Sequence, residues 1–164
     1  MMDDPSESTR ERRSQPDAEP ARYDRDLYSW AVEQAALLGA GRIAEADALN
    51  IAEELDDVGN EQYDKLESAL RIILLHLLKW DHQPERRSRS WQLSISIQRK
   101  HAARVLRKNP GLKAIVDEAI VEAYEIARIE AAAQTTLDED AFPLECPYSW
   151  HNIMEREIPW LPQS

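Results

Sequence analysis

The chain contains 164 residues, of which 43% are hydrophobic and 31% are charged, and it carries a formal net charge of −11. This length suits one domain, the apolar fraction is sufficient for a hydrophobic core, and the acidic balance argues against a nucleic-acid-binding protein. The single cysteine, Cys146, excludes an intrachain disulfide and a cysteine-rich structural zinc site.

The first 22 residues are rich in proline and charge and almost lack large apolar side chains. Such a composition cannot bury enough surface to offset the entropy cost of ordering the chain. We therefore predict that residues 1–22 form a disordered N-terminal tail and that residues 23–164 form a single helical domain.

Two helices are predicted at the start of this domain. The first begins with Asp24 as its N-cap and ends at Gly39, because aspartate caps helix starts and glycine follows helix ends. The second covers residues 43–58, where apolar and acidic side chains recur on opposite faces, and Gly59-Asn60 is expected to break or kink it. Its apolar face comprises Ala48, Ile51, Ala52, Leu55 and Val58.

The third helix is the most apolar stretch of the chain and is expected to form its core. It runs from Leu66 to about Gln83, and Pro84 ends it because proline disfavours helical geometry in the residue before it. Apolar residues follow the spacing of one helix face, and others lie outside that stripe, as in a helix buried on most sides. The stripe comprises Leu66, Ala69, Leu70, Ile73, Leu74, Leu77 and Trp80.

Two more helices and a proline-rich segment complete the predicted fold. Residues 90–109 fit both a strand and a helix pattern, and their length favours a helix, since a lone strand would have no partner. Residues 112–135 form the next helix, and in the proline-rich tail Ser149 could cap a short one. The sequence thus predicts an all-α fold, a helical bundle of about five main helices with a Pro-rich C-terminal segment packed on it.

Charge is distributed in three blocks along the chain. Residues 24–64 contain 11 acidic and 2 basic side chains, residues 65–113 contain 3 acidic and 12 basic ones, and residues 114–164 contain 11 acidic and 2 basic ones. A basic centre therefore lies between two acidic flanks, and ion pairs between them are available within the chain.

The turn after the core helix concentrates positive charge at a helix start. It comprises Arg86, Arg87, Arg89, Ser90 and Trp91. Cations at this position oppose the helix macrodipole, so an anionic group should lie nearby. We favour salt bridges to the chain's own carboxylates over an external phosphate. Nucleic acid, with Trp91 stacked on a base, is possible but not favoured, because the net charge opposes it unless the basic side chains all face outward.

An acidic cluster precedes the core helix and comprises Glu53, Glu54, Asp57 and Glu61. Like charges one turn apart repel, so a cation, a basic helix or solvent must relieve them. A metal site that includes His76 is one alternative, but no histidine here has a glutamate three residues before it, as helical di-metal sites require. A solvated or salt-bridged acidic face is the simpler interpretation, and whether a metal is bound stays open.

Three polar residues lie at the edge of the core helix: His76, Lys79 and Gln83. His76 lies one turn before Trp80, at the border of the apolar stripe, which is typical of a core histidine with a satisfied hydrogen bond. No nucleophile motif and no glycine-rich phosphate loop is present in the sequence, so no catalytic residue and no cofactor is predicted.

Three sequence blocks carry a resemblance to a known family. They are EELDDVG at residues 53–59, HLLKWDHQPERRSRSW at residues 76–91 and FPLECPYS at residues 142–149. With them the chain resembles a bacterial family called domain of unknown function 29. The resemblance implies an all-helical domain, and because the family has no assigned activity, it implies no catalytic residues.

We expect a non-catalytic cytoplasmic interaction module that binds another protein or a second copy of itself. Two alternatives stay open: a phosphate- or nucleic-acid-associated protein that uses the Arg86–Arg89 turn, and a metal-dependent enzyme built around Glu53, Asp57 and His76. The sequence contains neither a secretory signal nor an apolar run long enough to span a bilayer, so no membrane partner is expected.

Overall fold

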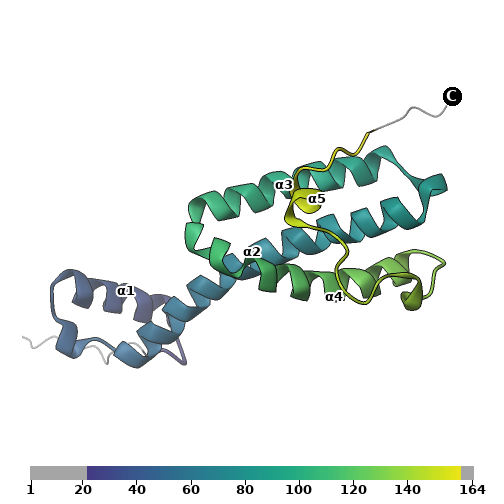
Figure 1. The fold of residues 1–164 in the computed structure, drawn as a ribbon. Helices are drawn as coiled ribbons and strands as arrows, with labels where there is room; N and C mark the ends of the chain where they lie inside the picture. Colours follow the sequence, from purple (N-terminus) through teal and green to yellow (C-terminus); the bar gives the residue numbers. More distant parts are fainter. Residues whose placement is uncertain (1–21, 160–164) are drawn as a thin grey trace, which may run out of the picture. The chain divides into compact units, whose positions relative to one another are not determined.

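The computed structural model describes residues 22–159, so the predicted disordered tail lies outside the described residues except for its last position. No strand occurs within residues 22–159, and the predicted all-α helical bundle is confirmed (Figure 1). Short 3₁₀ turns lie at Ile43–Glu45, Pro84–Arg86, Pro110–Ile115 and Glu139–Ala141. The α-helices are α1 (Leu27–Gly39), α2 (Ala48–His82), α3 (Arg89–Lys108), α4 (Val116–Gln134) and α5 (Trp150–Met154).

The chain divides into two compact units, one up to residue 53 and one from residue 54 onward. The division falls within α2, so the first residues of this helix belong to the first unit and the rest to the second. The prediction of one helical domain over residues 23–164 stays a prediction.

The first unit contains α1 and the start of α2. Its first helix begins two residues later than predicted, because Asp26 is the N-cap, with its carboxylate accepting a hydrogen bond of 3.0 Å from the Ser29 amide. Asp24 instead forms an ion pair with Arg22 in the preceding turn. The predicted end at Gly39 is confirmed, and the chain turns at Gly41, whose φ of 73° suits glycine.

The predicted interruption of the second helix at Gly59-Asn60 is wrong. α2 runs without a break from Ala48 to His82. Gly59 does not have a positive φ, and a mid-helix glycine costs only about 1 kcal/mol relative to alanine. The apolar packing of residues 66–80 stabilises the helix on its C-terminal side, so this cost does not end it.

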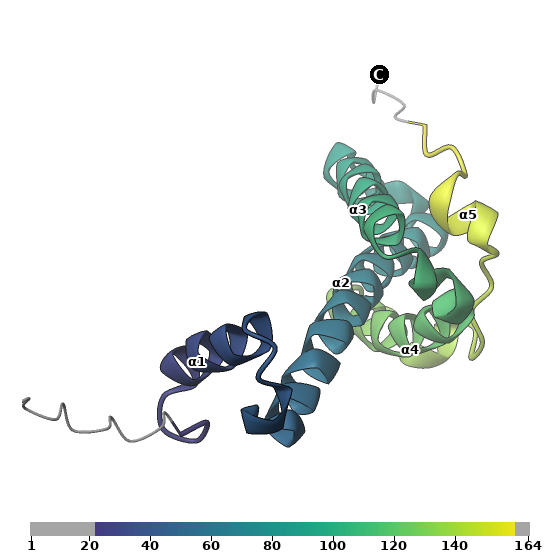
Figure 2. The same ribbon diagram turned by 90° about the vertical axis from the view of Figure 1, so that its left-hand side faces the viewer.

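The second unit is a bundle in which α3 and α4 lie alongside the C-terminal half of α2 (Figures 1 and 2). The predicted apolar stripe of α2 forms the centre of the core, since Leu66, Leu70, Ile73, Leu74 and Leu77 are fully buried. The ambiguous segment is a helix, α3, capped by Ser88, whose hydroxyl accepts a hydrogen bond from the Trp91 amide. α4 contributes a row of small buried residues that lets helices approach closely: Ala119, Ala123, Ala127 and Ala131.

The C-terminal segment packs on this bundle, as predicted. Phe142, Ile153 and Ile158 join the buried core from a chain that is mostly irregular. Ser149 caps α5 through a capping box with Asn152. The predicted helix over residues 112–135 begins as a 3₁₀ turn and becomes α-helical at Val116.

Apolar side chains remain exposed in the first half of α2, where an apolar face was expected to reach a core. Leu55 is 66% exposed and Val58 is 57% exposed. None of the helices in residues 22–159 has both the length and the apolarity required to cross a membrane.

Candidate functional site

The predicted arginine turn lies at the junction of α2 and α3, where α3 begins at Arg89, and one of its exposed arginines also contacts α2. Arg86, Arg89 and Ser90 are exposed to solvent. Arg87 folds back on α2, where its Nε donates a hydrogen bond of 2.9 Å to the Trp80 carbonyl and its guanidinium lies 5.1 Å from the centre of a Trp80 ring. Among residues 55–159, no carboxylate forms an ion pair with these arginines. The salt bridges to the chain's own carboxylates that the sequence favoured are therefore not found in this part of the chain, and an external anion stays the alternative prediction.

Trp91 and Lys79 lie together inside the bundle. The ammonium of Lys79 is 4.6 Å from the centre of a Trp91 ring and donates a hydrogen bond of 2.9 Å to the side-chain oxygen of Gln134. Burial lowers the pKa of Lys79. Lys79 and Gln83 are both buried, whereas the sequence placed them at the edge of the core. Trp91 is half-buried, and the Lys79 ammonium of the same chain already lies over its ring. The ring is therefore poorly placed to stack on a base of a nucleic acid.

His76 has the environment predicted for a core histidine. It is half-buried, and its Nδ1 lies 2.8 Å from the Ile72 carbonyl one turn earlier. Burial lowers the pKa of His76, while the hydrogen bond to the carbonyl acts in the opposite direction. A neutral imidazole held in this way fits a structural role.

The two blocks at residues 76–91 and 142–149 meet in space around Asp81. The Tyr148 hydroxyl donates a hydrogen bond of 2.9 Å to this carboxylate, and Arg156 binds it through two nitrogens at 2.6 and 2.9 Å. His82 packs its ring edgewise against Phe142, with 4.9 Å between ring centres. Partial burial pushes the pKa of Asp81 upward, but the hydrogen bonds from Arg156 and Tyr148 outweigh it and hold the pKa below its ordinary value. We refer to Asp81, Tyr148 and Arg156 as the Asp81 cluster.

Sequence reasoning missed this cluster, although a signal for it was present. An aspartate next to Trp80 at the end of an apolar helix needs a partner, because burying an unpaired carboxylate is costly. The sequence did not indicate which residues, 67 and 75 positions further on, would supply it.

Arg99 is a half-buried cation of the basic block, and it binds the C-terminal segment. Its guanidinium donates hydrogen bonds to three backbone carbonyls, those of Asn152, Ile153 and Arg156, at 3.0, 2.7 and 2.7 Å. Carbonyls at a helix C-terminus carry partial negative charge, so an arginine is well suited to them. Arg99 therefore holds α5 on α3 and is not available to a ligand.

The remaining bases of α3 face outward. Lys100, His101, Arg104, Arg107 and Lys108 are exposed, and none of them pairs with a carboxylate of residues 55–159. Ion pairs between the basic and acidic blocks occur elsewhere, as between Arg71 and Glu130 and between Asp81 and Arg156. The outer face of α3 is thus a positive surface whose charge is not cancelled locally.

A groove of about 400 Å³ lies between α2 and α3, beside this positive surface. Its floor is apolar, formed by Ala69, Ile72 and Val105, and its rim carries three basic side chains. We call it the α2–α3 groove, and its full lining is Lys65, Ser68, Ala69, Ile72, Gln98, His101, Arg104 and Val105.

The predicted acidic cluster is distributed over both units. Glu53 belongs to the first unit, and Glu54, Asp57 and Glu61 belong to the second. Glu61 forms an ion pair of 2.7 Å with Lys65 one turn later, and both side chains stay at least half exposed. In the part of the chain that the structure describes, no three histidine, cysteine or acidic side chains converge on a point where a metal ion could bind.

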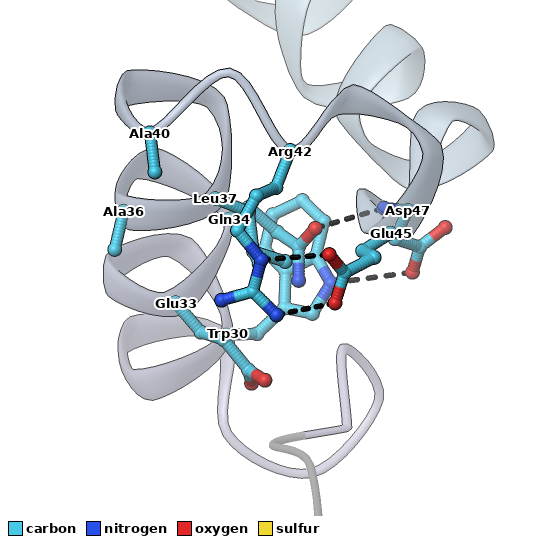
Figure 3. A pocket seen from close by; sticks show the side chains of 9 residues that line it. All are labelled: Trp30, Glu33, Gln34, Ala36, Leu37, Ala40, Arg42, Glu45 and Asp47. Atoms are coloured by element: carbon cyan, nitrogen blue, oxygen red, sulfur yellow. Dashed lines mark hydrogen bonds and ion pairs between the residues drawn. The ribbon is translucent and has the colours of Figure 1, made fainter.

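The first unit has a hollow of about 700 Å³ beside α1, lined by residues that the sequence analysis did not single out (Figure 3). The buried Trp30 indole donates a hydrogen bond of 3.2 Å to Asp47, and the Asp47 amide donates one of 2.8 Å to Gln34. Asn50 donates a further hydrogen bond to Asp47 and is the main cause of the lowered Asp47 pKa. These polar groups form hydrogen bonds with one another and thereby join α1 to the start of α2. The residues that line the hollow therefore have a structural role.

A family model described as domain of unknown function DUF29 matches residues 22–158. The match spans most of the chain, and the chain therefore belongs to this family, as the resemblance predicted. Neither a curated protein nor a solved structure matches the chain.

Proposed function

We propose that this member of the DUF29 family is a non-catalytic interaction module that binds an acidic amphipathic helix of a protein partner in the α2–α3 groove. The observation that carries this proposal is the groove itself, in which an apolar floor is bordered by positive charge. An amphipathic helix binds such a groove by placing its apolar side chains on the floor and its charged ones at the rim.

The surroundings of the groove support an acidic partner. Lys100 and Arg104 are exposed one turn apart on α3, and Leu93 and Ile97 continue the same helix face with exposed apolar surface. Lys65 at the rim is paired with Glu61, so the unpaired positive charge beside the groove is that of Arg104 and Lys100. Such charge beside an apolar floor attracts an acidic partner and speeds its association.

Nucleic acid fits these observations less well. The exposed bases would suit a polyanion, but a phosphate backbone does not need an apolar floor, and the chain as a whole carries a net charge of −11. A metal-dependent activity has less support still, since no metal-binding group of side chains is found among the described residues. We place the module in a bacterial cytoplasm, which the presence of a single cysteine supports.

The test is the binding of a labelled synthetic peptide, helical and glutamate-rich with leucines at heptad positions, measured by fluorescence anisotropy. Arg104→Glu reverses a charge at the groove rim and should weaken binding at least about tenfold, or about 1.4 kcal/mol. Lys113→Glu reverses an exposed charge that does not line the groove, and it should change the affinity less than about twofold.

Equal losses in the two variants would contradict the proposal, because the effect would then follow net charge and not the groove. A single-stranded oligonucleotide that binds more tightly than the peptide would favour the nucleic-acid alternative. Circular dichroism of both variants checks that each keeps the helical fold.

A further inference from the structure

We infer that a hollow between α4 and the irregular chain after it binds a basic, extended segment of a partner protein, with an apolar side chain beside its cations. The hollow has a volume of about 760 Å³ and is lined by side chains from residues 121–129 and 139–146. We call it the α4 hollow. It shares no lining residue with the α2–α3 groove, so this second site does not depend on the proposed function.

The walls of the α4 hollow are held in place by hydrogen bonds between α4 and the chain that follows it. The buried Tyr124 hydroxyl donates one of 2.6 Å to the Pro143 carbonyl. Arg128 donates one of 3.3 Å to the Phe142 carbonyl and one of 2.6 Å to the Glu139 carboxylate. The hollow is therefore formed before any ligand arrives, which lowers the entropy cost of binding.

Apolar side chains around the α4 hollow remain in contact with solvent. Leu144 is 79% exposed, and Val121 and Ile129 on α4 are each 56% exposed. An apolar side chain of a partner would bind here favourably, because it would remove this surface from water. Apolar burial alone would suit many partners, and the charge around the hollow restricts the choice.

The charge around the α4 hollow is negative and is not cancelled locally. Glu125 and Glu145 line the hollow, are exposed and form no ion pair within residues 55–159. Residues 114–159 contain two arginines and no lysine, and both arginines, Arg128 and Arg156, already bind other carboxylates. Unpaired carboxylates beside apolar surface favour a cationic partner over a neutral or an acidic one.

The chain beside the α4 hollow also has backbone groups without partners, which favours an extended segment over a helix. The backbone amides of Leu144, Glu145 and Cys146 donate no hydrogen bond within residues 22–159. A helix has already paired its own carbonyls, whereas an extended peptide can offer them to these amides. Side chains of an extended peptide alternate in direction, so a leucine can enter the hollow while neighbouring arginines reach the carboxylates.

The first test is the binding of a short labelled peptide in which arginine and leucine alternate, measured by fluorescence anisotropy with the full chain. Glu125→Lys reverses a charge at the α4 hollow and should weaken binding at least about tenfold. Glu118→Lys makes the same reversal at an exposed position of α4 that does not line the hollow, and it should change the affinity less than about twofold. Equal losses in the two variants would overturn the inference, because binding would then follow net charge alone.

The apolar part of the α4 hollow is tested with Leu144→Ala, which should weaken peptide binding at least about fivefold. Leu49→Ala is a matched control, since Leu49 is 85% exposed and belongs to the first unit, and it should leave the affinity unchanged. A second peptide, with every leucine replaced by serine, should bind much more weakly to the unmutated chain. Equal binding of the two peptides would show that the hollow is not the site.

Hydrogen–deuterium exchange tests the extended mode of binding. The amides of Leu144, Glu145 and Cys146 should exchange more slowly when the arginine–leucine peptide is bound, because they then donate hydrogen bonds. Peptide binding without slower exchange at these amides would overturn the inference. A chain that binds the acidic helical peptide but not the arginine–leucine peptide would also overturn it and would leave the proposed function intact.

Discussion

Leu74→Ala is expected to lower the free energy of unfolding by about 2–5 kcal/mol. Leu74 is fully buried at the centre of the stripe where α2 meets the rest of the second unit. The substitution removes three carbon atoms from the core, so buried apolar surface is lost and a cavity remains. The neighbouring side chains are closely packed and cannot move far enough to fill it. Urea denaturation followed by circular dichroism measures the change.

A matched control for this substitution is Leu144→Ala. Leu144 belongs to the same unit but is 79% exposed, so its replacement should change the free energy of unfolding by less than about 0.5 kcal/mol. A Leu74→Ala effect below about 1 kcal/mol would show that α2 does not form the centre of the core.

Asp81→Asn is expected to lower the free energy of unfolding by about 1–2 kcal/mol near neutral pH. The carboxylate receives two hydrogen bonds from Arg156 and one from Tyr148, and only 28% of its side chain is exposed. Hydrogen bonds to a charged group contribute more than neutral ones, and the substitution leaves the Arg156 guanidinium without its counter-charge. The Asp57→Asn control removes an exposed aspartate and should have little effect.

The same variant should change how stability depends on pH. The pKa of Asp81 is held below its ordinary value of 3.8, so its contribution is present above that pH and is lost as pH falls through the lower folded value. The advantage of the unmutated chain over Asp81→Asn should thus be complete at pH 5–7 and should shrink below about pH 4. A difference that stays constant down to pH 3 would contradict the assigned role of the carboxylate.

The architecture of the bundle could be predicted because its signals are local. Hydrophobic spacing identified α4 and the core half of α2, length identified α3 as a helix, and terminal residues identified the end of α1 and the start of α5. The errors also have local causes. Two aspartates compete to cap α1, and the choice of Asp26 over Asp24 depends on the turn that Asp24 makes with Arg22. A glycine such as Gly59 weakens a helix, but flanking packing decides whether the helix continues.

The candidate site was less predictable because its contacts join distant positions. The sequence indicated that the basic block needs partners, but it did not show that Arg99 takes three backbone carbonyls or that Arg87 takes the Trp80 carbonyl. Carbonyl partners leave no trace in the charge pattern. The sequence led us to expect ion pairs at the arginine turn. It did not predict that the basic side chains of α3 face outward, and this outward-facing charge supports the proposed function.

The most direct test of the proposed function is an NMR titration of the ¹⁵N-labelled protein with the acidic helical peptide. If the α2–α3 groove is the binding site, the amide signals that move should cluster at residues 65–72 of α2 and 98–105 of α3, and Arg104→Glu should reduce those shifts. Signals that move instead along α4, or shifts that are the same in Arg104→Glu and Lys113→Glu, would contradict binding in the groove.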